Sequence, residues 1–244
     1  MTSHKLSALS PQLLHCDVAN MVNIQNTRCA QRIHAATFAK SMRAIGISAV
    51  ETDADSGGLA RDIAMTTAGF GKRVMLINAR EMSEFGITGN SAAAFMTGAI
   101  ASNEGFLDVR IVRGSNAHRT INNAQQLSQL LLELAETVDA IIVDLPAHDE
   151  PMPAVYAPIT AVSMDAVFLA AMPSITTALQ LGEAMSWLTE SGAVIAAIVI
   201  NDRFNPVLGE EIIREAKRLT RFFPFFPRFI ERLIANSPAL NRYH

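Results

Sequence analysis

The amino-acid sequence predicts an α/β fold in which a mainly parallel central sheet is covered by helices on both faces. Short runs rich in β-branched residues alternate along the chain with longer stretches of helical pattern. Parallel strands joined by crossover helices produce this alternation. Some of the runs, such as Ala140–Val143, are apolar throughout, which is typical of strands covered on both faces.

The individual elements follow from the same pattern. The predicted strands are Gly46–Val50, Arg73–Ile77, Val109–Val112, Ala140–Val143, Ala166–Ala170 and Val194–Ile200. Helices are expected at 57–70, 90–102, 120–137, 174–191 and 207–222. A chain of 244 residues fits one large α/β domain. We therefore expect an N-terminal arm at 1–27, with at most one short helix, a single domain at 28–220 and a C-terminal tail at 221–244.

Composition and charge limit the classes of partner. The net charge is −3 and the isoelectric point is near 6.1, so no global field attracts nucleic acid, and none is expected as a partner. The longest apolar runs, such as Ala193–Ile200, are too short to cross a bilayer. Cys16 and Cys29 lack metal-ligand spacing and are expected to be reduced thiols. These features favour a cytoplasmic protein that is at most peripheral at the inner membrane.

The segment from Gly46 to Arg80 has the strand–turn–helix–strand order of a phosphate-binding unit. In such a unit, glycines let backbone N–H groups surround the phosphates, a lysine reaches the β/γ oxygens, and a Ser/Thr holds magnesium. Here the turn from Glu51 to Gly58 has the sequence ETDADSGG. The order of elements is retained, but the residues that perform this chemistry are different.

Several segments of the chain carry a family resemblance. Ala64–Arg80 resembles the helix and second strand of ParA/MinD-type P-loop ATPases, where a Gly-Lys-Arg-Val turn leads to a strand ending in Asp-Ala-Asp. Val138–Pro146 resembles their Walker B strand, in the Asp-x-Pro form typical of bacterial tyrosine kinases (BY-kinases). Pro173 with Thr176-Thr177, and then Gly192-Ala193 followed by Ile198–Asn201, is similar to a later segment of that group. The resemblance runs from about residue 40 to 205 and implies a three-layer P-loop NTPase-like fold.

This sequence departs from the family at the nucleotide site. Counting back from Gly71-Lys72 with the family spacing places Ser56 at the P-loop lysine, and Gly57 and Gly58 at the magnesium-binding Ser/Thr pair. Asn78 replaces the first aspartate of Asp-Ala-Asp, and only Asp144, the Walker B carboxylate, remains. Asp53 and Asp55 add negative charge where phosphate would bind. We therefore expect a degenerate nucleotide site formed by Ser56, Gly57, Gly58, Asn78 and Asp144, with no catalytic residue, no metal and no ATP or Mg cofactor.

Other interpretations of single residues remain open. Asp144 is either a remnant of a metal site or, as we favour, a strand-end aspartate that caps the next turn. Gly57 and Gly58 either bind an anion through free N–H groups or form a tight turn. The segment His148-Asp149-Glu150 follows the Walker B strand, where sites open in α/β sheets, and is a minor candidate.

The C-terminal tail concentrates aromatic and basic residues. Its candidate interaction residues are Phe222, Phe223, Phe225, Phe226, Phe229, Arg228 and Arg232. Pro224 and Pro227 prevent one continuous helix, so the rings cannot all form one regular core stripe. The tail either packs on the domain or docks outward onto a partner or a membrane surface.

By resemblance, the chain is expected to be a non-catalytic, pseudo-ATPase relative of the BY-kinases. These act with membrane-embedded chain-length proteins in capsule and exopolysaccharide export, which implies a partner or scaffold role with a polysaccharide chain-length or export protein. A homo-oligomer is also open. The chain lacks the family's tyrosine-rich C-terminus, since Tyr156 and Tyr243 are its two tyrosines, and its Glu-x-x-Arg-x-x-Arg helix. Autophosphorylation is therefore not expected.

Two alternative functions remain. One is a MinD/ParA-like positioning protein, for which the basic Phe-rich tail would supply the amphipathic membrane helix. The other is an active nucleotide-binding enzyme with a non-standard P-loop.

Overall fold

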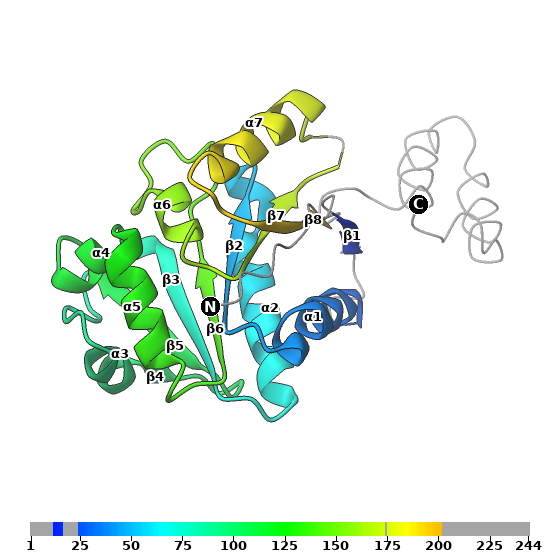
Figure 1. Ribbon diagram of the computed structural model, residues 1–244. Coiled ribbons are helices and arrows are strands. Elements are labelled where there is room, and N and C mark those ends of the chain that lie inside the picture. The colour runs from blue at the N-terminus through cyan, green and yellow to red at the C-terminus, as the bar shows by residue number, and fades with distance from the viewer. Residues whose placement is uncertain (1–11, 17–23, 174, 202–244) are drawn as a thin grey trace, which may run out of the picture.

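The computed structural model describes residues 12–16, 24–173 and 175–201, with side chains from residue 28 onward (Figure 1). Within these residues, eight strands form one sheet in the order β1-β8-β7-β2-β6-β3-β5-β4. The strands are β1 (Gln12–Cys16), β2 (Ala44–Ala49), β3 (Val74–Ser83), β4 (Ile100–Ala101), β5 (Leu107–Val112), β6 (Ala140–Asp144), β7 (Ala166–Ala171) and β8 (Ile195–Asn201). All neighbouring strands run parallel except β4, which is antiparallel to β5. The mainly parallel sheet is confirmed.

Helices cover both faces of the sheet. They are α1 (Ile24–Ala36), α2 (Ser56–Gly69), α3 (Ala92–Gly98), α4 (Asn116–Ile121), α5 (Ala124–Leu134), α6 (Ala157–Ala161) and α7 (Ala178–Thr189), with short 3-10 turns η1 (Phe38–Lys40) and η2 (Thr52–Ala54). Core residues of α1 and α2 pack on one face, and those of α3 to α7 pack on the other. Figure 1 shows α1 and α2 across the sheet from α5. The three-layer α/β architecture is therefore confirmed.

Strand β6 explains how the sequence produces two cores. Its burial is complete along its length, and successive side chains point to opposite faces. Ile141 and Val143 belong to the core under α3 to α7, whereas Ala140 and Ile142 belong to the core under α1 and α2. An all-apolar strand is therefore what a doubly covered sheet requires.

The differences from the expected elements have local causes. The helix expected at 120–137 is two helices, because Asn123 caps α5 by accepting a hydrogen bond from the Gln126 backbone N–H at 3.0 Å. Helices α1 and α6 and the two-residue β4 were not predicted from the sequence. Residues 12–16 were assigned to the irregular arm, yet they form β1 and pair with β8. The helix expected at 207–222 lies outside the described residues.

The expectation that both cysteines are reduced thiols is wrong for Cys29. Cys29 is disulfide-bonded. It lies on α1, and α1 contacts β1, the strand that ends at Cys16. The two cysteine-bearing elements therefore meet at the β8 side of the sheet, a proximity that sequence spacing alone did not reveal.

Among the helices in the described ranges, none is both long enough and apolar enough to cross a membrane.

Candidate functional site

The candidate site lies where the central strands end. Because β6 lies between β2 and β3, the carboxyl ends of these parallel strands share one edge, with Asn78 directly opposite Asp144. Ligands bind open α/β sheets at this edge. A cleft of about 960 Å³ opens there, and Gly57, Gly58, Asn78 and Asp144 are among its lining residues. The fold thus brings together the residues that sequence spacing selected, with Ser56 directly behind them.

Asp55 occupies the start of helix α2. It is the N-cap residue, with φ 52° and ψ 45°, and its side chain accepts a hydrogen bond from the Gly58 backbone N–H at 3.2 Å. In the motif G-x-x-x-x-G-K-[ST], the residue before the lysine is glycine, which adopts positive φ without strain. A Cβ on Gly58 would lie 2.6 Å from Asp55 Oδ2, so the carboxylate lies directly against the first turn. The helix N-terminus that would attract a phosphate already holds an anion.

Ser56 and Asp144 form a buried pair beneath the loop. Ser56 Oγ donates to Asp144 Oδ1 at 3.1 Å. Burial raises the pKa of Asp144 to about 7, although the Ser56 hydrogen bond and the positive charge of Arg80 act in the opposite direction. Protonated and ionised forms of Asp144 are therefore both populated at neutral pH.

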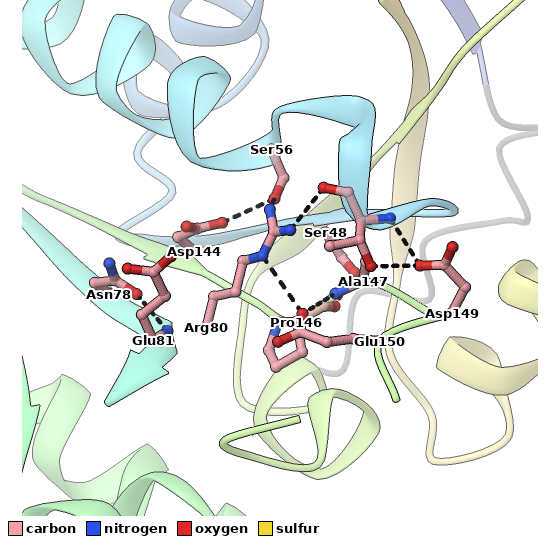
Figure 2. A network of polar contacts seen from close by, with 11 residues as sticks. Ser48, Ser56, Asn78, Arg80, Glu81, Asp144, Pro146, Ala147, Asp149 and Glu150 are labelled. Carbon is pink, nitrogen blue, oxygen red and sulfur yellow. Dashed lines mark hydrogen bonds and ion pairs between the residues drawn. The ribbon is translucent and has the colours of Figure 1, made fainter. Parts of the chain in front are cut away.

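The guanidinium group of Arg80 occupies the inside of the loop (Figure 2). Its Nη2 donates to the Thr52 carbonyl at 2.6 Å, its Nη1 donates to Ser56 Oγ at 3.3 Å, and its Nε lies 3.4 Å from Glu150 Oε2. The side chains of Arg80 and Glu150 are each only 16% exposed. An arginine stays charged throughout the pH range of proteins. The loop that lacks the P-loop lysine is thus supplied with a cation from β3.

The segment that follows β6 holds the loop from its other side. Asp149 Oδ1 accepts hydrogen bonds from both the backbone N–H and the hydroxyl of Thr52, each at 2.7 Å. Glu150 Oε2, already beside Arg80, also accepts from the Ala147 backbone N–H at 3.2 Å. Figure 2 shows these residues converging on the loop. The loop conformation is therefore fixed by side chains from β3 and from the end of β6.

Asn78 has a local role at this edge. Its side-chain oxygen accepts a hydrogen bond from the Glu81 backbone N–H at 2.9 Å. The register between β3 and β5 shifts between Asn78 and Met82, and this hydrogen bond closes the resulting bulge. An aspartate that would orient an attacking group is thus replaced by an amide that stabilises the backbone.

Other predicted residues lie elsewhere. The ring of His148 is 5.1 Å from the ring of Trp187 on α7, away from the cleft lining. Its buried Nδ1 has no hydrogen-bond partner within the described part of the chain. In the part of the chain that the structure describes, no group of three or more His, Cys, Asp or Glu could hold a metal. The Phe/Arg tail candidates lie outside the described residues.

Sequence reasoning missed the residues that complete the site. Arg80 was recognised only as part of a replaced motif and Glu150 only as part of a minor candidate segment, and Thr52 was given no role. The available signal was a double change: the loop lost its lysine while the strand end gained an arginine. A cation lost from one element and gained on its neighbour is a pattern that a search for substituted motifs could detect.

Comparison with known proteins supports the fold. No protein-family model matches the chain, and no curated protein matches it. Among solved structures, the kinase domain of the Escherichia coli tyrosine kinase ETK has a TM-score of 0.60 at 18% identity, covering 72% of this chain and 74% of that chain. The BceF tyrosine kinase domain has a TM-score of 0.58 at 19% identity, covering 73% and 76%. The MinD cell division protein of Aquifex aeolicus has a TM-score of 0.52 at 15% identity, covering 82% and 92%.

These similarities identify the architecture. The chain has the fold of the P-loop ATPase superfamily, with similarity both to BY-kinase domains and to MinD-type ATPases. At identities below 20%, the comparison concerns the fold and leaves the activity to be argued from the site.

Proposed function

We propose that this chain is a BY-kinase-like protein that does not use ATP and acts as a non-catalytic partner or scaffold in bacterial exopolysaccharide or capsule biosynthesis and export. The observation that carries the proposal is that the phosphate loop is filled by its own side chains. Asp55 supplies an anion at the start of α2, and Arg80 supplies the cation inside the loop.

A nucleotide phosphate would compete with the side chains that already occupy the loop. A nucleotide phosphate would have to approach the Asp55 carboxylate, and two like charges about 5 Å apart repel by roughly 1–3 kcal/mol in a partly screened site. Arg80 could turn to the phosphate only by leaving Glu150, which would then stay largely buried without its partner. Among the described residues that line the cleft, no lysine compensates for either cost. The loop is therefore more stable closed on itself than open to ATP.

The partner class is inferred from the similarity to tyrosine kinase domains. A membrane-embedded polysaccharide chain-length or export protein is the proposed partner, and the proposed location is the cytoplasm, peripheral to the inner membrane. The tail from Arg221 to Leu240 is the proposed membrane- or partner-docking segment. Homo-oligomerisation is compatible with this role.

Calorimetry and thermal unfolding with Mg-ATP test the loss of nucleotide chemistry. A ligand at one thousand times its Kd stabilises a protein by about 4 kcal/mol, which for this chain length raises the melting temperature by roughly 8–16 °C. We expect no such rise and no binding heat at millimolar Mg-ATP. A shift of several degrees would overturn the proposal that ATP is not used and would favour an active nucleotide-binding enzyme with a non-standard loop.

The genomic neighbourhood tests the biological role independently. Glycosyltransferase and export-channel genes beside this gene are the expected finding. Division or partition genes in their place would favour a MinD/ParA-like positioning protein.

A further inference from the structure

A shallow groove runs along the outer surface of α7. It has a volume of about 520 Å³, and we name it the α7 groove after its lining residues Leu179, Gly182, Glu183, Ser186, Trp187 and Glu190. Residues 179, 183, 186 and 190 recur at helical spacing, so they form one continuous stripe of the helix. Leu179 is 72% exposed. The groove therefore presents the apolar side chain of Leu179 and part of the Trp187 ring to solvent between polar residues of the helix.

The apolar surface continues onto α6. The ring of Tyr156 meets the ring of Trp187 edge-on at 6.0 Å, and the Ser191 hydroxyl ties the two helices together by donating to the Pro158 carbonyl at 2.8 Å. Tyr156 and Ile159 are both exposed at the surface. Aromatic side chains of this kind are enriched at protein interfaces.

Gly182 gives the groove an open floor. It lies inside α7, where glycine is less favourable than alanine by roughly 1 kcal/mol. A Cβ built on Gly182 would meet no atom within 4 Å, so no steric demand of the described structure requires glycine here. The missing side chain leaves the helix backbone accessible to a group that approaches from outside.

The charge around the groove has a single sign. Glu183 and Glu190 are exposed, and neither forms a salt bridge with any described residue. The sequence from Thr120 to Asn201 contains no lysine or arginine, although the chain has 20 of these residues. An apolar groove edged only by carboxylates is complementary to a cationic amphipathic segment. It is repelled by the anionic surface of a cytoplasmic leaflet.

We propose that the α7 groove binds the basic cytoplasmic juxtamembrane segment of a membrane protein. The cytoplasmic flanks of transmembrane helices are enriched in Lys and Arg, next to an apolar or aromatic end. Such a segment supplies an apolar anchor for the floor at Gly182 and cations for Glu183 and Glu190, and one cation stacks on the Trp187 ring. The membrane protein is identified as the export partner only if the proposed function holds. The chemistry of the groove stands without it.

The full chain offers a direct reporter, because Trp187 is its single tryptophan. The probe is a 20-residue helical peptide of leucine and lysine with one apolar and one basic face. We expect it to shift Trp187 emission on titration. A Glu183→Lys, Glu190→Lys variant should bind it at least tenfold more weakly. A Glu133→Lys, Glu136→Lys variant, with the same change of charge at exposed positions of the α5 region, should bind it as the wild type does.

Several outcomes would overturn the proposal. If both double variants bound the peptide equally weakly, the loss of binding would reflect net charge and not the groove. If a peptide with glutamate in place of lysine bound as well as the lysine peptide, the carboxylates of the groove would have no role in recognition. A shift of Trp187 emission by phosphatidylglycerol vesicles would make the surface a lipid site. Self-association that the Glu183→Lys, Glu190→Lys variant abolishes would assign the groove to a second copy, and tighter binding of a peptide of residues 221–240 would assign it to the chain's own tail. Mg-ATP binding tests the phosphate loop, whereas peptide binding tests the α7 groove, so either proposal can fail without the other.

Discussion

The sheet edge that carries the loop at residues 51–58, here called the loop edge, differs from the α7 groove in how its charged groups are paired. At the loop edge, the charges of Asp55, Arg80 and Glu150 are engaged by groups of the same chain, and Ser56 bridges Arg80 to Asp144. In the α7 groove, the carboxylates have no cation among the described residues, and the apolar surface faces solvent. The comparison indicates that the charged groups of the loop are already paired within the chain, whereas the carboxylates of the α7 groove have no cation among the described residues.

The segment after β6 touches both regions. Asp149 and Glu150 hold the loop, whereas the ring of His148 lies against Trp187 of the α7 groove. The closure is also incomplete. Glu51 is buried at the start of the loop, and neither of its carboxylate oxygens has a hydrogen-bond partner among the described residues.

The largest expected effect tests the closure of the loop. Replacing Arg80 by alanine removes its contacts with Thr52, Ser56 and Glu150, and leaves Glu150 without its cation. Breaking a mostly buried ion pair is strongly destabilising, and we expect a loss of about 2–4 kcal/mol in urea unfolding. Arg61→Ala is the matched control, because the Arg61–Glu104 pair is exposed and should contribute less than about 1 kcal/mol. Equal losses in the two variants would show that Arg80 does not hold the loop.

The next effect is a dependence on pH at Asp144. Its pKa in the folded state is raised to about 7 from 3.8, so the folded chain binds more protons than the unfolded chain between these values. The stability of the wild type therefore falls as the pH rises from about 4 to about 7. Asp144→Asn keeps an acceptor for Ser56 but has no charge to bury, and should be more stable than the wild type at pH 8 by about 1–3 kcal/mol. The advantage should shrink as the pH is lowered.

Asp139 provides the control for the direction of this pH dependence. Hydrogen bonds from Arg73 lower the pKa of the exposed Asp139, so its contribution is present above the unfolded pKa and is lost as the pH falls. Asp139→Asn should therefore bring no gain at pH 8. A gain in both variants would attribute the effect to net charge rather than to burial of Asp144.

Much of the fold could be predicted because the central strands are apolar on both faces. Runs such as Ala140–Val143 have few alternatives to a doubly covered sheet. The edges were harder to predict. Strand β1 has five residues and owes its place to pairing with β8, a contact between segments far apart in sequence. The break between α4 and α5 was missed because a single capping side chain, Asn123, determines it.

The site could be located but not completed from the sequence. Spacing placed Ser56, Gly57, Gly58, Asn78 and Asp144 on one edge, because parallel strands in known order share that edge. The path of the Arg80 side chain depends on χ angles and on acceptors in two other segments, which no spacing rule encodes. Sequence therefore showed which groups were lost, and the structure showed what had replaced them.

A smaller effect is expected at the cap of α2. Asp55→Ala removes the hydrogen bond to the Gly58 N–H and places a Cβ-bearing residue without a side-chain acceptor at φ 52°. We expect a loss of about 1–2 kcal/mol in chemical unfolding. Asp55→Gly should cost less, since glycine adopts this conformation freely. A larger loss for glycine than for alanine would contradict a left-handed backbone at this position.

The smallest expected effect is that of a glycine-to-alanine substitution, made once in each of the two regions. Gly182→Ala places a methyl group where no atom lies within 4 Å, so the gain in helix propensity should stabilise the chain by about 0.5–1 kcal/mol. Gly57→Ala is the matched change in α2, but its methyl group would lie 3.1 Å from Asp144 Oδ2, beside a buried hydrogen bond. Tight packing there should make the same substitution destabilising, by about 1 kcal/mol or more. Thermal unfolding of the two variants should thus give melting temperatures on opposite sides of the wild type. If Gly182→Ala also destabilised the chain, the floor of the α7 groove would already be occupied by part of the protein, and the contrast between a closed loop and an open groove would fail.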